Sequence, residues 1–580
     1  MVARMSERPT SFMRPLFEGV IQDDMLVPFP DVPSSQREAL ADAELRARDT
    51  SRRVLDGRAI DRAGEMPRET HSALAEAGVY GVTLPTAHGG AGLGLRASAT
   101  YYETLGSIDL SVAATSIAHA GMVGRAIARA GTDSQAAAWL PAMASGQLLA
   151  AFALAEPLTG SDAAAVGTRV FERGGALTLD GTKHYVTNGR HAGLFLVFAK
   201  REDERPGELS AFLVPAQEGT SRGPVRDFVG LRGAGLGAVS FESVTLAPDA
   251  ALGPRGAGFR LAMEVQDAAR VELAASCIGA ARGALSQIVE RASSRRAFGR
   301  PLREFGMVQQ RIAHMSCALY TASCATRLTA GFMDAQAGAD GELPDCGIEA
   351  AMCKVLAAEA YQQVALSSLD LAGGMGTLTD HPFERHLRDA RAMMVYGGSH
   401  DVLRSFIALA GLERTDERVH TSSSTLRERV KQLGVIRELR AQRARRGFGR
   451  ERFGTVHPSL AREGVIFEEL IARFGSETER IARKHGDALG RRQFVQHRLA
   501  DVALDLFGVA AVLAATSQAV LQRGPERSRG LLDLATACVE LARVRVGPAL
   551  DHMDRDADEL LKQVAADVCD QAAATALRSS

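Results

Sequence analysis

The sequence predicts an α+β multidomain protein: an N-terminal helical domain, a central β domain, a helical bundle and an additional C-terminal helical domain. Two patterns indicate this order. Apolar residues recur every three and four positions over most of the chain, whereas short apolar runs between glycine and proline fill the second segment. The expected domains are residues 1–147, 148–258 and 259–412, an arginine-rich linker at 413–458, and residues 459–580.

The composition sets limits on the function. A chain of 580 residues with 46% hydrophobic residues is long enough for a large buried core and several domains. A formal net charge of -1 argues against nucleic acid as the main partner, because phosphate binding normally needs a concentrated basic face. The 7 cysteines are isolated, with no CxxC pair, which favours buried thiols, no metal site and a reducing compartment.

The first ten residues contain charges and prolines but no apolar core of the signal-peptide type. We also expect no membrane span, since no window approaches about 20 consecutive apolar residues. Both observations predict a cytoplasmic protein.

The N-terminal part, residues 35–146, has helical periodicity at Leu40, Ala43 and Leu45 and again from 112 to 127. Residues 84–94 interrupt it with a glycine-rich stretch that predicts a loop. Strands are expected in four runs of the second segment: Ala176–Asp180, Leu194–Ala199, Ala211–Val214 and Ala238–Phe241.

Helices return over residues 259–412, with breaks at 373–376 and 397–398. The segment 427–452 that follows has ten basic residues against three glutamates, which is typical of a solvated linker. Apolar periodicity from 460 to 568 then predicts the fourth domain.

Five ordered motifs resemble those of the acyl-CoA dehydrogenases, and the fold order is that of the same family. They are Ala151–Asp162 (AFALAEPLTGSD), Asp180–Gly189 (DGTKHYVTNG), Ser294–Pro301 (SRRAFGRP), Leu371–Gly376 (LAGGMG) and Tyr396–Asp401 (YGGSHD). The resemblance runs from about residue 35 to the end, and the extra C-terminal domain makes the very-long-chain branch most similar in kind.

The resemblance implies FAD as cofactor. It places Thr187 near flavin N5, gives Tyr185 the role of shielding the ring, and makes the loop 156–161 a source of backbone N–H groups; Ala155 departs from the usual hydroxyl residue. The cofactor-binding residues that it implies are Phe152, Leu154, Ser161, Tyr185, Thr187, Arg295, Phe298, Gly373, Gly374, Ser399 and Asp401.

Two of these residues imply an oligomer. Arg295 and Phe298 match residues that contact the FAD of a neighbouring subunit, so we expect a homodimer. Asp370 stands where the family commonly has glutamine, and a carboxylate beside FAD phosphates would repel them. Its side chain is therefore expected to weaken FAD binding or to point elsewhere.

The implied substrate is an acyl thioester, carried by CoA or by a carrier protein. The substrate-binding residues that the resemblance implies are Ser161, Asp267, Arg270 and Gly398. Oxidation at Cα–Cβ needs a base for the α-proton and a donor for the thioester oxygen, and the family obtains both from one glutamate. Here that position is Gly397, which keeps the N–H donor and deletes the base.

Some branches carry the glutamate immediately before Arg270, where this chain has Ala269. Loss of a positioned base costs about 10²- to 10⁴-fold in rate. His400 and Asp401 lie close in sequence, but on a helix they are expected to face differently from position 397.

The resemblance thus implies an FAD-dependent acyl-CoA dehydrogenase-like oxidoreductase of fatty acid metabolism, with a non-standard site that lacks the usual glutamate base. It also implies an electron acceptor such as an electron-transfer flavoprotein. A flavin- or acyl-CoA-binding subunit of a mixed assembly, with little activity of its own, is the first alternative. A scaffold in weak peripheral contact with a membrane through residues 427–452 is the second.

Overall fold

The computed structural model describes residues 11–413 and 452–579, apart from 203, 206, 225, 339–342 and 556, and it describes no side chains from 573 onward. Within this range the chain forms two compact units. The first contains residues 25–403, and the second joins residues 12–24 to those from 404 onward. The arginine-rich stretch at 427–451 lies outside the described residues.

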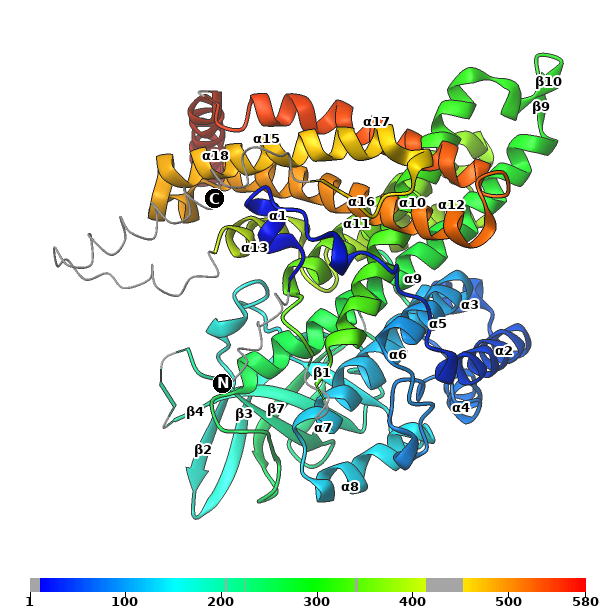
Figure 1. The fold of residues 1–580 in the computed structure, drawn as a ribbon. Helices are drawn as coiled ribbons and strands as arrows, with labels where there is room; N and C mark the ends of the chain where they lie inside the picture. Colours follow the sequence, from blue (N-terminus) through cyan, green and yellow to red (C-terminus); the bar gives the residue numbers. More distant parts are fainter. Residues whose placement is uncertain are drawn as a thin grey trace, which may run out of the picture. The chain divides into compact units, whose positions relative to one another are not determined.

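Helices make up the N-terminal part of the first unit (Figure 1). Side-chain caps fix where several begin: Asp109 accepts hydrogen bonds from Ser111 and Val112 at the start of α6, and Thr132 and Gln135 form a capping box at the start of α8. The expected loop at 84–94 is confirmed, with one short 3-10 turn inside it. The elements are η2 (Ser34–Gln36), α2 (Arg37–Val54), α3 (Gly57–Ala63), α4 (Arg68–Glu76), η3 (Thr86–His88), α5 (Leu95–Ile108), α6 (Leu110–Ser116), the π-helix η4 (Ile117–Gly124), α7 (Arg125–Ala130) and α8 (Asp133–Ala144).

A mixed sheet follows, in the order β6-β7-β3-β2-β4-β5-β8, with β1 paired to β4 in parallel. All four predicted strands are present and are longer than their apolar runs, because polar residues continue β3 and β7 past the core. The strands are β1 (Ala150–Ala153), β2 (Arg169–Arg173), β3 (Ala176–Val186), β4 (Leu194–Arg201), β5 (Ser210–Pro215), β6 (Thr220–Arg222), β7 (Gly237–Thr245) and β8 (Ala251–Leu252), and η5 (Ala163–Ala165) lies between β1 and β2.

Long helices complete the first unit, and both predicted interruptions are confirmed. The 37-residue α9 and the 26-residue α11 are packed together and have many alanines among their buried residues. The elements are α9 (Gly258–Ser294), the hairpin strands β9 (Arg296–Ala297) and β10 (Arg300–Pro301), η6 (Leu302–Glu304), α10 (Gly306–Gln336), α11 (Gly347–Ala372), η7 (Gly373–Thr377) and α12 (Pro382–Met393); α13 (His400–Leu412) begins in this unit, and its residues from 404 onward belong to the second.

The second unit is helical and includes a short N-terminal helix. The Phe17 ring lies 5.1 Å from that of Phe474, and Thr478 Oγ1 donates to the Phe17 carbonyl at 2.5 Å. Residues 12–24 therefore pack with C-terminal helices, a pairing that no local pattern indicates. The elements are α1 (Met13–Phe17), η9 (Pro458–Leu460), α15 (Ala461–His485), η10 (Gly486–Arg491), α16 (Gln493–Arg523), α17 (Arg529–Asp551) and α18 (Ala557–Ser579).

The expectation that no segment has the composition of a membrane span was wrong for α16. This helix is the one found, among the described residues, to be long and apolar enough to cross a membrane. The best window has a mean hydropathy of 1.8, but 83% of it is buried inside the protein. Such burial is what the core helix of a helical domain shows, so length and composition alone are weak evidence for a span.

Candidate active site

The position of the missing glutamate lies in a turn between α12 and α13. Gly397 has φ +73° and Gly398 has φ +115°, conformations that side chains with a Cβ rarely adopt. Within the described part of the chain, the N–H of Gly397 has no hydrogen-bond acceptor. The turn therefore presents an unused backbone donor where the family's oxyanion donor is expected.

Two buried cations hold the carbonyl groups of this turn. Arg270 Nε donates to the Gly397 carbonyl at 3.3 Å, and Lys354 Nζ donates to the Gly398 carbonyl at 2.7 Å and to that of Met394 at 3.4 Å. Arg270 comes from α9 and is 9% exposed; Lys354 comes from α11 and is 1% exposed. The predicted substrate residues Arg270 and Gly398 thus lie next to Gly397.

Asp267 supports Arg270 from one helical turn away. Its carboxylate accepts a hydrogen bond from Arg270 Nη1, and Gln266 accepts one from Nη2. Burial raises the pKa of Asp267 to about 6, and the carboxylates of Asp345 and Glu264 contribute in the same direction, although Arg270 opposes the shift. Asp267 is ionised at neutral pH and takes up a proton in mildly acidic solution.

Of the flavin-facing residues predicted near the end of β3, Thr187 contacts the residue that precedes Gly397 in this turn. Thr187 Oγ1 and Tyr396 Oη are 2.7 Å apart, which joins the end of the strand to the residue before Gly397. Tyr185 is 64% exposed and has φ +55°, an uncommon conformation for a tyrosine. Backbone outliers of this kind gather at ligand-binding sites, and an exposed aromatic ring fits the role of shielding a flavin.

Neither expected position for the base has an acid, and the titratable groups nearby in sequence are paired with other residues or exposed. His400 Nδ1 lies 3.1 Å from Glu359 Oε1 on α11, and Asp401 is exposed. Glu272 is fully buried on α9, where it accepts hydrogen bonds from Arg125 and Ser98. These contacts agree with the expectation that His400 faces differently from position 397.

The motif that begins at Ala151 forms β1 and a loop held by a buried ion pair. Lys183 Nζ, which is 0% exposed on β3, donates to Glu156 Oε1 at 2.8 Å and to the carbonyls of Leu154 and Phe198. Glu156 also accepts from Gly167 and Thr168. Burial raises the pKa of Glu156, but these donors outweigh it and hold the pKa at about 2.

Four other predicted cofactor residues vary in exposure. Phe152 is half-buried on β1, with its ring 5.0 Å from that of Phe198, and Leu154 is buried just after the strand. Ser161 is exposed at the loop tip, and Ser399 is half-buried before α13.

A second group of predicted cofactor residues lies at the opposite end of α9 and α11. Arg295 caps α9, and Phe298, at the tip of the β9–β10 hairpin, is 96% exposed with φ +48°. Gly373 and Gly374 follow α11, and no atom lies within 4 Å of where a Cβ would stand at either residue. Arg295 is 25 positions beyond Arg270, which is about 37 Å along a helix.

Asp370 does not stand unpaired at this end. Its carboxylate lies 2.8 Å from Arg311 Nη1 on α10, and both side chains are about half exposed. The Asp370 carboxylate therefore has a cationic partner on α10.

Sequence reasoning missed two residues of the site. Lys354 is the only charged residue between Glu349 and Glu359 in an otherwise apolar run, and that isolation was the available signal. Leu273 carried no signal: its Cδ1 lies 2.9 Å from where a Cβ would stand at Gly397. A side chain at 397 therefore needs Leu273 to move.

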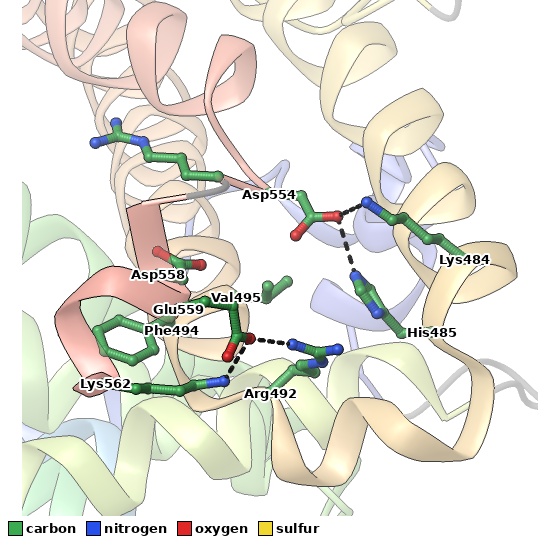
Figure 2. Close-up of a pocket in the computed structure, with 10 residues that line it drawn as sticks. Lys484, His485, Arg492, Phe494, Val495, Asp554, Asp558, Glu559 and Lys562 are labelled. Atoms are coloured by element: carbon green, nitrogen blue, oxygen red, sulfur yellow. Dashed lines mark hydrogen bonds and ion pairs between the residues drawn. The ribbon is translucent and has the colours of Figure 1, made fainter. Parts of the chain in front are cut away.

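A cavity of about 300 Å³ in the second unit contains none of the predicted site residues. Six of its charged or titratable side chains pair with one another: Asp554 binds Lys484 and His485, and Glu559 binds Arg492 and Lys562 at 2.8 Å each (Figure 2). The cavity has no connection with the chemistry predicted from the motifs.

The residues present fit FAD. The Thr187 hydroxyl lies beside Tyr396 of the turn, and the exposed ring of Tyr185 stands two residues earlier in the chain. Open glycine backbone and an exposed arginine lie where phosphates are expected.

Four family models match the chain. They are the acyl-CoA dehydrogenase N-terminal domain at residues 41–147, the middle domain at 151–244, the C-terminal domain at 256–412, and the ACAD9/ACADV C-terminal domain at 458–574. The human very long-chain specific acyl-CoA dehydrogenase is 31% identical over 568 residues, covering 95% of this chain and 86% of the relative. The chain belongs to the acyl-CoA dehydrogenase family.

Two further matches extend this result. The 3-(aryl)acrylate reductase of Clostridium sporogenes is 32% identical over 60% of this chain and 91% of its own length. The crystal structure of an acyl-CoA dehydrogenase complexed with FAD from Bacillus anthracis matches with a TM-score of 0.80 and 22% identity, over 95% of this chain and 94% of that one. The predicted fold class is confirmed, and the chain is an acyl-CoA dehydrogenase-like oxidoreductase with FAD as its cofactor.

Proposed function

We propose that this chain oxidises an acyl thioester whose α-C–H is unusually acidic, or which carries its own base, so that no side-chain carboxylate is required. One observation supports the proposal. The turn at Gly397 retains an N–H donor that has no intramolecular acceptor among the described residues, and Arg270 and Lys354 hold the carbonyl groups of this turn. Positions 397 and 269, where the family has its acid, lack one.

The chain's own groups can stabilise the thioester oxygen, but they do not supply the base that takes the α-proton. The Gly397 N–H would donate to the thioester oxygen as that oxygen gains enolate charge, and Arg270 would hold the peptide in place. FAD, when bound, supplies the acceptor for the hydride that leaves Cβ. The α-proton would pass to a basic group of the substrate or to solvent.

A panel of thioesters tests this proposal. Anaerobic bleaching of the flavin should occur with acyl-CoA or acyl-carrier-protein thioesters whose α-proton is acidified by a neighbouring group, and should be about 10²- to 10⁴-fold slower with simple saturated chains. Equal rates with both sets would contradict it. A yellow protein that no thioester bleaches would instead identify the binding subunit of a mixed assembly.

Restoring the carboxylate provides a second test. At Gly397, φ +73° and the 2.9 Å approach to Leu273 Cδ1 disfavour any side chain, with a backbone cost of about 1–2 kcal/mol. We therefore expect Gly397→Glu with Leu273→Ala to gain dehydrogenation of simple acyl-CoA, and Gly397→Gln with Leu273→Ala to gain none. Equal rates in the two double variants would mean that the carboxylate is not what the site lacks.

We also propose a homodimer, an electron-transfer flavoprotein as acceptor, a role in fatty acid metabolism and a cytoplasmic location. The roughly 37 Å between Arg270 and Arg295 supports the dimer, because the hairpin is then available to the FAD of a second chain. Isolated thiols support the reducing compartment.

Two measurements test these proposals. Sedimentation of the purified protein tests the dimer. Flotation with anionic vesicles at low and high salt tests a weak membrane contact through residues 427–452.

A further inference from the structure

Lys354 is placed to determine where the N–H of Gly397 points. Its Nζ donates to the carbonyls of Met394 and Gly398, at 3.4 and 2.7 Å, so one ammonium group joins both ends of the five-residue segment that contains Gly397. The lysine is 1% exposed on α11 and cannot leave this position for solvent. We propose that Lys354 is a positioning residue for the oxyanion donor, an inference that rests on the proposed function of the turn.

Apart from Tyr396, whose Oη lies 2.7 Å from Thr187 Oγ1, the residues of this segment provide little support of their own. Gly397 and Gly398 have no side chains to pack and both have positive φ, so the unfolded chain has many conformations available there. Met394 caps the C-terminus of α12, where helix carbonyls lack intrahelical donors and favour a cation. An ammonium at this point satisfies the helix end and fixes the turn together.

Arg270 and Lys354 act on neighbouring peptides from different helices. The 2.7 Å contact of Lys354 is typical of a charge-assisted hydrogen bond, whereas the 3.3 Å contact of Arg270 is longer. The stronger anchor therefore comes from the residue with no expected contact to substrate. A neutral side chain of similar length should free the turn while leaving the thioester contacts of Arg270 in place.

The test compares Lys354→Met, which keeps the length of the stem, with Lys354→Arg, which keeps a charged donor, and with Lys200→Met on β4 as the control. Hydrogen exchange in a peptide covering residues 394–399 should be at least about tenfold faster in Lys354→Met. Isotope-edited infrared spectra of a bound thioester with a ¹³C carbonyl should lose the red shift caused by the Gly397 donor.

With a turnover substrate, kcat should fall about 10- to 100-fold in Lys354→Met and KM should change less than threefold. Lys354→Arg should recover most of kcat and of the infrared shift. The proposal is overturned if Lys354→Met binds FAD and thioester with an unchanged infrared shift and exchange rate, or if Lys354→Arg behaves as Lys354→Met does. If Lys354→Met does not fold, Lys354→Arg and Lys354→Gln give the same comparison.

The spectra and the exchange rates need no turnover. A wild-type protein that no thioester reduces would refute the proposed function, while the infrared shift of the bound thioester would still decide the role of Lys354.

Discussion

Predicted substrate and cofactor residues lie at both ends of the helix pair α9 and α11, but they are buried and hydrogen-bonded at one end and exposed at the other. At the substrate end, defined by Arg270, Lys354 and the turn at Gly397, the turn's carbonyls are held by buried cations. At the hairpin end, defined by Arg295, Phe298, Gly373 and Gly374, the aromatic ring is 96% exposed and the glycines border open space.

The predicted site therefore combines two kinds of surface, one buried and paired within the chain and one exposed. The substrate end is pre-organised within a single chain, because its buried charges and turn carbonyls have partners in the same unit. The hairpin end gives an exposed ring and bare backbone, which become useful when another surface and a ligand cover them. Changes at the first end should affect folding and chemistry, and changes at the second should affect cofactor affinity.

The largest effect is expected from Lys183→Met, in the buried ion pair that holds the loop after β1. Removing one partner of a buried ion pair costs about 3–5 kcal/mol, because Glu156 would keep a buried charge without its main donor. Urea unfolding should show this loss of stability, and Lys183→Met with Glu156→Gln should recover part of it. A loss below about 1 kcal/mol would mean that water or local rearrangement compensates the carboxylate.

The next effect is expected at the hairpin end. Arg295→Ala should weaken FAD binding by about 10- to 100-fold, the value of a charge-assisted hydrogen bond to phosphate, with stability unchanged because the side chain is exposed. Titration of FAD into apoprotein measures this loss, and Arg303→Ala, another exposed arginine nearby, serves as the control. Equal affinities in the two variants would remove Arg295 from the cofactor site.

The sequence contains more information on the geometry of the hairpin end than on that of the substrate end, for a physical reason. Arg295 and Phe298 belong to one short motif, and the open backbone of Gly373 and Gly374 follows directly from glycine. The contacts at the turn of Gly397 and Gly398 depend instead on residues 44 and 127 positions away, which only the tertiary fold brings together. Lys354 was visible as an isolated lysine, but its two carbonyl partners were not.

The fold was predictable wherever periodicity is strong. The long helices and four of the strands follow the apolar pattern, because burial of one face determines them. The packing of Phe17 on Phe474 joins residues more than 450 positions apart, and local propensity has no information on such a contact. The composition of α16 likewise fits either a membrane span or a buried helix, and burial in the fold identifies the second.

A smaller effect is expected from pH at the substrate end. Since the pKa of Asp267 is raised to about 6, its carboxylate accepts from Arg270 above that pH and is protonated below it. The apparent affinity for thioester should fall about three- to tenfold between pH 7 and pH 5. Asp267→Asn should show no inflection near pH 6, and an unchanged inflection in this variant would assign the titration to another group.

The same shift has a defined sign for stability. A carboxyl whose folded pKa is raised favours the protonated form, so its contribution is full below the unfolded value of 3.8 and is lost as the pH rises through about 6. The wild type should therefore gain stability relative to Asp267→Asn as the pH falls from 7 to 4. Unfolding midpoints of both proteins across this range measure the difference.

The smallest effect is expected from Asp370→Gln at the hairpin end. An exposed pair such as Asp370 and Arg311 contributes about 0–1 kcal/mol, so stability should change by less than about 0.5 kcal/mol and FAD affinity by less than about fivefold. If the carboxylate faced the FAD phosphates instead, removing it would tighten binding more than about tenfold, and high salt would reduce that gain. Arg311→Gln is the matched control, because it leaves the acid without this partner and should weaken FAD binding at low salt. FAD titrations at two ionic strengths thus test whether the ion pair with Arg311 prevents Asp370 from weakening FAD binding.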